Sequence, residues 1–81
     1  MNKSEFLEEL VTNWNEPTFD YNGKPCGIAL SALNGVYTFT MWYGDKTKKY
    51  SEIDELMTDN FFDNLSLTDI LPELDVWFWA T

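Results

Sequence analysis

The stretch IALSALNGVYTFTMWY, residues 28–43, restricts the possible fold more than any other part of the chain. The pair Asn34-Gly35 stands between two runs in which apolar and polar residues alternate, and this is the strongest short-range signal for a β-hairpin. The predicted pairs are Ile28 with Met41, Leu30 with Phe39 and Ala32 with Tyr37 on an apolar face, and Ala29 with Thr40 and Ser31 with Thr38 on the other. A slip of one residue would mix the two faces, so the pattern predicts this register.

Turn signals on both sides of this hairpin predict further strands. Asn22-Gly23 is a second hairpin signal, between residues 19–21 and residues 24–26. Gly44-Asp45 then turns the chain into residues 46–50, whose three lysines suit an edge strand because charge there discourages pairing with other chains. Together these segments predict an antiparallel meander.

Three segments have the periodicity or the capping signals of helices. Residues 5–14 place their apolar side chains on one face at the 3.6-residue spacing of a helix. Ser51 is expected to open a capping box before a second helix over residues 52–61. Ser66 or Thr68 is expected to cap a short third helix.

The C-terminal residues 75–80 admit two structures. Val76 and Phe78 alternate with Trp77 and Trp79, which suits a final strand, while a helical continuation of the preceding segment also fits. The expected fold is therefore α+β in a single domain of residues 1–81. Its sheet is a three- to four-stranded antiparallel meander with a possible final strand, and an N-terminal helix and one or two C-terminal helices pack on one face.

The side chains that usually perform catalysis are scarce. The chain has no histidine, which excludes a Ser-His-Asp or Cys-His arrangement. Cys26 is the single cysteine, so neither an internal disulfide nor a thiolate metal cluster can form. The acidic residues between 52 and 63 lack the spacing of an EF-hand loop, and no glycine-rich phosphate loop is present. We predict no catalytic residues, no cofactor and no metal site.

The charge of the chain limits its partners. Fourteen acidic residues against five lysines give a net charge of −9, and there is no arginine to contact phosphates or guanine. Direct binding to nucleic acid or to an anionic membrane surface is therefore not expected. The N-terminal residues do not resemble a secretory signal, and no run approaches the ~20 apolar residues of a membrane span, so we expect a cytoplasmic protein.

Three functions are weighed, and the least favoured is a hydrolase or metal-carboxylate enzyme, which would require a pocket with converging carboxylates. The first is a small acidic protein-interaction or regulatory module without catalytic activity. The alternative is an acidic nucleic-acid mimic that inhibits a basic DNA- or RNA-binding protein. If residues 75–80 form a strand, Phe78 joins the core, and Trp77 and Trp79 lie on the opposite face together with Trp42. These three tryptophans are then the candidate surface for a protein partner or for self-association, unless they simply close the core.

Overall fold

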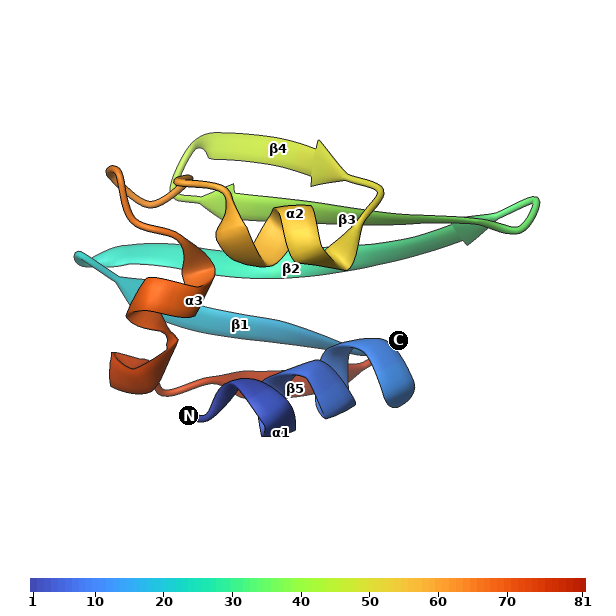
Figure 1. Ribbon diagram of the computed structural model, residues 1–81, viewed down its shortest axis with the longest axis horizontal. Coiled ribbons are helices and arrows are strands. Elements are labelled where there is room, and N and C mark those ends of the chain that lie inside the picture. Colours follow the sequence, from blue (N-terminus) through green and yellow to red (C-terminus); the bar gives the residue numbers. More distant parts are fainter.

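The computed structural model describes all residues from Met1 to Thr81 and has one antiparallel sheet with helices on one of its faces (Figure 1). In chain order the elements are α1 (Lys3–Leu7), a π-helical segment (Glu8–Thr12), β1 (Asn15–Tyr21), β2 (Lys24–Leu33), β3 (Val36–Tyr43), β4 (Lys46–Tyr50), α2 (Ile53–Thr58), α3 (Leu67–Ile70), a 3₁₀ turn (Leu71–Glu73) and β5 (Trp77–Ala80). The strand order is β4-β3-β2-β1-β5. The predicted α+β fold is confirmed, with a sheet of five strands.

The hairpin of β2 and β3 has the predicted register at every pair. The observed pairs include Ile28 with Met41, Leu30 with Phe39 and Ser31 with Thr38. Asn34 and Gly35 have φ values of 53° and 76°, as a type I′ turn requires. The tip of this hairpin projects beyond the helices (Figure 1), and it leaves Leu33 and Val36 exposed.

The neighbouring hairpins also follow the predicted turns. Phe19 lies opposite Cys26 in the pairing of β1 with β2. β4 pairs with β3 alone, so its three lysines do lie on an edge of the sheet.

The final strand is present, so the choice between strand and helix for the C-terminal segment is settled for the strand. β5 pairs antiparallel with β1, with Trp77 opposite Thr18. Phe78 points to the helix-covered face and packs on Phe6 of α1, with ring centroids 5.7 Å apart.

The pairing of β1 with β2 stops early because of a proline. Pro17 has no N–H to donate, and the last aligned pair is Thr18 with Gly27. The backbone N–H of Leu30 instead donates to the carboxylate of Glu16 at 2.8 Å. This side chain satisfies a donor that would otherwise lack a partner.

The N-terminal helix differs from the expected residues 5–14. It begins at Lys3, after Asn2 caps it by accepting from the N–H of Glu5, and it ends at Thr12. Its second half is π-helical, and the N–H of Asn13 bonds across five residues to a carbonyl 2.9 Å away. A π turn contains an extra residue and shifts the following side chains around the axis. Periodicity based on 3.6 residues therefore fails here.

The second helix is shorter than the predicted 52–61. It spans Ile53–Thr58, and the residue before it, Glu52, makes no side-chain capping bond, so the capping box expected from Ser51 is wrong. The helix ends because Asp59 has extended backbone, with ψ of 136°. No helix in the structure has the length and apolar character needed to cross a membrane.

The third helix begins with one of the two expected caps. Ser66 accepts from the N–H of Asp69, whose carboxylate accepts from the N–H of Ser66 in return. The other candidate, Thr68, instead donates its hydroxyl to the carbonyl of Met57 at 2.7 Å and so links α3 to α2. Pro72 follows in a short 3₁₀ turn.

The core lies between the helices and the sheet. Seventeen buried apolar residues form one cluster there. Phe62, which lies between α2 and α3, is completely buried and joins several aromatic rings. Its ring neighbours, with centroids 5.2 to 6.0 Å away, are Phe19, Tyr21, Tyr43 and Phe61.

Two tyrosine–aspartate hydrogen bonds hold the segment after α2 against the sheet. Tyr50 of β4 donates its hydroxyl to Asp59 at 2.7 Å, and Lys48 forms an ion pair with the same carboxylate at 2.8 Å. Tyr43 of β3 donates to Asp63 at 2.5 Å. The segment that carries Phe62 is therefore fixed at both of its ends.

These contacts shift the protonation of the groups involved. The bonds from Lys48 and Tyr50 lower the pKa of Asp59, and the bond from Tyr43 lowers the pKa of Asp63. A carboxylate with a lowered pKa stabilises the fold above its unfolded pKa, and this contribution is lost as the pH falls through the folded value. The two tyrosine–aspartate hydrogen bonds therefore make their full contribution to stability at neutral pH.

Candidate functional site

The three tryptophans named from the sequence lie on the sheet face that the helices leave uncovered. Directly opposed residues on paired strands share a face, and one row runs across the sheet. This row consists of Thr47, Trp42, Gly27, Thr18 and Trp77. Trp79, two residues after Trp77 in the same strand, shares the face. We call Trp42, Trp77 and Trp79 the tryptophan face.

The two tryptophans of β5 are strongly exposed on this surface. Trp77 is 71% exposed and Trp79 is 60% exposed, so neither closes the core. The indole N–H of Trp79 donates to the hydroxyl of Thr18 at 2.8 Å, which directs this ring toward the centre of the sheet.

Trp42 lies across the middle of the sheet because Gly27 has no side chain. A Cβ added at Gly27 would be 2.6 Å from Cη2 of Trp42 and 2.8 Å from the carbonyl oxygen of Pro17. The strands β3 and β5 are separated by two others, or about 14 Å at the usual strand spacing. The ring of Trp42 extends from β3 over Gly27 of β2, and the ring of Trp79 extends from β5 to Thr18 of β1. The two rings are therefore closer to each other than the strands that carry them.

Gly27→Ala is expected to displace the indole of Trp42 and to force β1 away from β2. Both contacts are closer than real Cβ atoms tolerate, and one is with backbone, so we expect a loss of about 1–3 kcal/mol in the free energy of unfolding. Urea denaturation measures the loss in stability, and near-ultraviolet circular dichroism reports the change in the environment of the Trp42 indole. Ser31→Ala, on the same strand and face, is the control and is expected to change neither. An unchanged spectrum and stability for Gly27→Ala would contradict the placement of Trp42.

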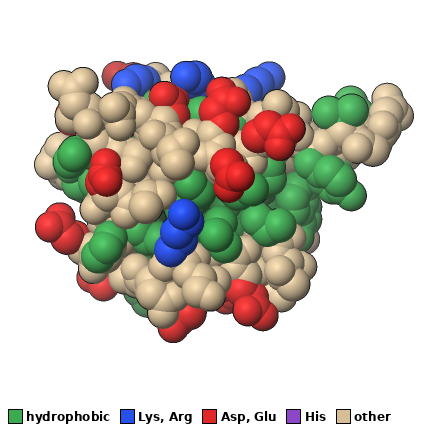
Figure 2. Space-filling model, in the orientation of Figure 1, with side chains coloured by type: hydrophobic (Ala, Val, Ile, Leu, Met, Phe, Trp, Pro, Cys, Tyr) green, Lys and Arg blue, Asp and Glu red, His purple; other side chains and the backbone are tan.

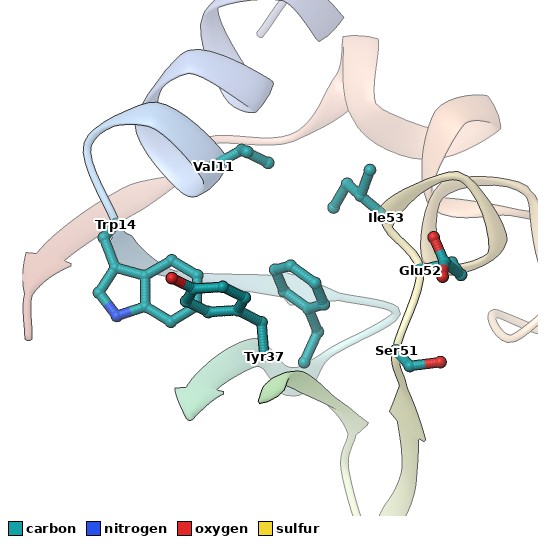
Figure 3. A pocket seen from close by; sticks show the side chains of 7 residues that line it. Val11, Trp14, Tyr37, Ser51, Glu52 and Ile53 are labelled. Carbon is teal, nitrogen blue, oxygen red and sulfur yellow. The ribbon is translucent and has the colours of Figure 1, made fainter. Parts of the chain in front are cut away.

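A second surface feature, which the sequence did not predict, is a groove on the helix-covered face. It has a volume of about 550 Å³. Val11 and Ile53 face each other across it, and Trp14 and Tyr37 close one end (Figure 3). The rings of Trp14 and Tyr37 meet edge to face, with centroids 5.4 Å apart. Figure 2 shows apolar side chains gathered on this face near the base of the projecting hairpin.

The groove arises from the unexpected end of the N-terminal helix. Val11 is 44% exposed, although the predicted apolar stripe would bury it. Trp14 has a positive φ of 57°, which is strained for a bulky residue, and the chain turns there into β1. Ser51 and Glu52 supply the polar part of the lining. The groove offers an apolar recess with one carboxylate, and no second acid or base accompanies it.

The remaining reactive group is enclosed. Cys26 is 1% exposed, and burial raises the pKa of its thiol to about 11. A thiol with such a pKa is protonated at neutral pH and is a poor nucleophile. Nowhere in the chain do three histidine, cysteine or carboxylate side chains come together as a metal site. The absence of catalysis, cofactor and metal stays a prediction.

Acidic side chains are spread over several elements. Figure 2 shows them at separate places around the helix-covered face, with lysines along the edge where β4 lies. A nucleic-acid mimic needs its acids on one surface, and this distribution gives that alternative no specific support. It stays a prediction.

Comparison with known proteins found no family that matches this chain, and neither a curated sequence nor a solved structure matches it. Function must therefore be inferred from the surfaces themselves.

The sequence identified the large side chains of the tryptophan face and missed the residues that support them. Gly27 and Thr18 set the positions of Trp42 and Trp79. A glycine within a strand often marks a close approach of other groups, and Gly27 carried that signal. No local signal marks the groove, because it depends on the π turn and on packing between distant elements.

Proposed function

We propose that this protein is a small cytoplasmic protein-interaction module without catalytic activity, and that the tryptophan face contacts its protein partner. The observation that carries the proposal is the exposure of Trp77 and Trp79, at 71% and 60%, on a sheet face without helices. Soluble proteins rarely expose large apolar side chains next to one another unless the surface binds something. Tryptophan is also among the residues that contribute most to protein–protein binding.

The rest of the open face suits a protein contact. Polar residues on the same face of β2, β3 and β4 form a rim around the tryptophans: they are Ser31, Thr38, Thr40 and Lys49. The tryptophans stand on hydrogen-bonded strands, so once β5 is docked little further ordering would accompany binding, and preorganisation of this kind improves affinity.

The test is the double variant Trp77→Thr and Trp79→Thr. Threonine suits a strand, so the fold should persist with the loss of about 0.5–1.5 kcal/mol from the hydrogen bond to Thr18. We expect the native protein, used as bait in a lysate of its source cells, to retain a partner that the double variant does not retain. Analytical ultracentrifugation of both proteins tests self-association in the same way.

The control is Leu33→Thr with Val36→Thr at the hairpin tip. These side chains are also strongly exposed, at 69% and 60%, and lie away from the tryptophans. A partner that depends on the tryptophan face should still bind the control variant and should not bind the double variant. Equal loss from both variants would indicate general adhesion of apolar surface. A double variant that fails to fold would show that the tryptophans are needed for stability, and the proposal would be withdrawn.

A further inference from the structure

A small hollow adjoins Trp77 at the edge of the sheet. It has a volume of about 310 Å³ and is lined by Phe19, Asp20, Glu73, Asp75 and Trp77. β5 begins at Trp77, opposite Thr18, so Phe19 and Asp20 continue β1 past the start of β5. The hollow lies where β5 begins, and Trp77 belongs both to its lining and to the tryptophan face.

Three of the five residues that line the hollow are acidic. Asp20, Glu73 and Asp75 form no side-chain hydrogen bond, and the one ion pair of the protein is elsewhere, between Lys48 and Asp59. Like charges gathered in one place repel one another, and an opposite charge placed among them is stabilised. The hollow therefore favours a cation from outside the chain.

Two positive groups lie beside the 3₁₀ turn that carries Glu73: the N-terminal ammonium group, which donates to the carbonyl of Leu71 at 3.3 Å, and Lys3, which lines a neighbouring recess with Leu71 and Pro72. Neither forms an ion pair with an acid of the hollow, and two other lysines are engaged elsewhere. Lys46 donates to the carbonyl of Phe61 at 2.9 Å, and Lys24 lies over the ring of Tyr43 at 4.9 Å. β4, which carries most of the lysines, forms the opposite edge of the sheet from β5.

We propose that the hollow receives an arginine side chain from a basic segment of a partner protein, an inference that rests on the tryptophan face being the contact surface. A guanidinium group stacks on an indole and forms paired hydrogen bonds with carboxylates, and the hollow presents both next to each other. Residues beside that arginine would then lie on the tryptophan face. The partner's charge complements the net charge of −9.

A second copy of this chain does not fit the hollow. The chain has no arginine, and two molecules with a charge of −9 repel each other. Nucleic acid is excluded by the same charge. The chemistry of the hollow thus selects a basic protein segment among the possible occupants.

The experiment measures binding of a fluorescent hexa-arginine peptide by anisotropy at moderate salt. The test variant neutralises the hollow with Asp20→Asn, Glu73→Gln and Asp75→Asn. The control removes the same charge at exposed acids elsewhere, with Glu8→Gln, Asp45→Asn and Glu55→Gln. We expect the test variant to lose about tenfold or more in affinity, because charge-assisted bonds are lost, and the control to lose no more than about threefold. Equal losses in both variants, or no binding by the native protein, would overturn the proposal.

A second measurement locates the peptide. In a two-dimensional NMR spectrum, the indole N–H signal of Trp77 is expected to shift at lower peptide concentration than that of Trp14, which lies in the groove on the helix-covered face. A native partner that requires Trp77 and Trp79 but is unaffected by the hollow variant would sink this inference and leave the proposed function standing. Loss of peptide binding only in the hollow variant, without any partner that needs the tryptophans, would show that the hollow binds arginine but would overturn the proposed function, and with it the partner that this inference assigns.

Discussion

Ile28→Asp is expected to remove a large part of the protein's free energy of unfolding. Ile28 is completely buried in the middle of β2, opposite Met41, which is also completely buried. An unpaired carboxylate in that position would cost about 3–5 kcal/mol or more, and a domain of this size has a total stability on the order of 4–12 kcal/mol. Far-ultraviolet circular dichroism and urea denaturation measure the outcome.

Ser31→Asp introduces the same charge three residues further along the same strand and is the matched control. Ser31 is exposed on the open face, opposite Thr38, so the change should stay within about 0.5 kcal/mol. Similar destabilisation by both variants would mean that the two faces of β2 are not separated as the structure has them.

The second large effect is expected at Phe62, where alanine should cost about 3–5 kcal/mol. Phe62 is completely buried among four other aromatic rings, and the segment that carries it has little regular structure of its own. Removing the ring leaves a cavity beneath the sheet and loosens the segment between α2 and α3. Thermal and urea unfolding measure the loss, and weaker near-ultraviolet dichroism would report the loosened aromatic cluster.

Tyr37→Ala serves as the control for Phe62→Ala. Tyr37 is an aromatic residue of similar size that is 57% exposed and meets one other ring, that of Trp14, so its removal should cost no more than about 1 kcal/mol. If Phe62→Ala were as mild as Tyr37→Ala, the aromatic cluster would not be the centre of the core.

The hairpins were predictable because their signals are local. Asn22-Gly23 and Asn34-Gly35 each define a turn, and the alternation of side chains around Asn34-Gly35 then determines the register. The ends of the first two helices were not predictable in this way. Periodicity at 3.6 residues does not show the π turn, and the early end at Asp59 accompanies a bond from Tyr50 of β4 that the helical pattern does not contain.

The candidate site likewise has a part that local patterns predict and a part that they do not. The period of two in β5 placed Trp77 and Trp79 on one face, and the hairpin register placed Trp42 there. Pairing of β5 with β1 joins residues far apart in sequence, and no local pattern shows it. The hollow beside Trp77 requires Asp20 and Glu73 to meet, so it follows only from the assembled sheet.

The position of β5 has a consequence for the order in which the sheet assembles. The strands from β1 to β4 are joined by two-residue turns, so their hairpins close locally and quickly, on a scale of about 1–10 μs each. β5 must instead find β1 across the long stretch of chain between Thr18 and Trp77, and closing so long a loop costs more entropy. Such a strand is expected to dock late and to detach first.

The tryptophan face therefore consists of two parts with different lifetimes. Trp42 belongs to the hairpin that forms early, while Trp77 and Trp79 arrive with β5. A partner seated across both parts binds only molecules in which β5 is docked, and by mass action it holds that strand in place. Binding and the last step of folding would then share one equilibrium, so that a change which loosens β5 weakens the complex without touching the contact surface.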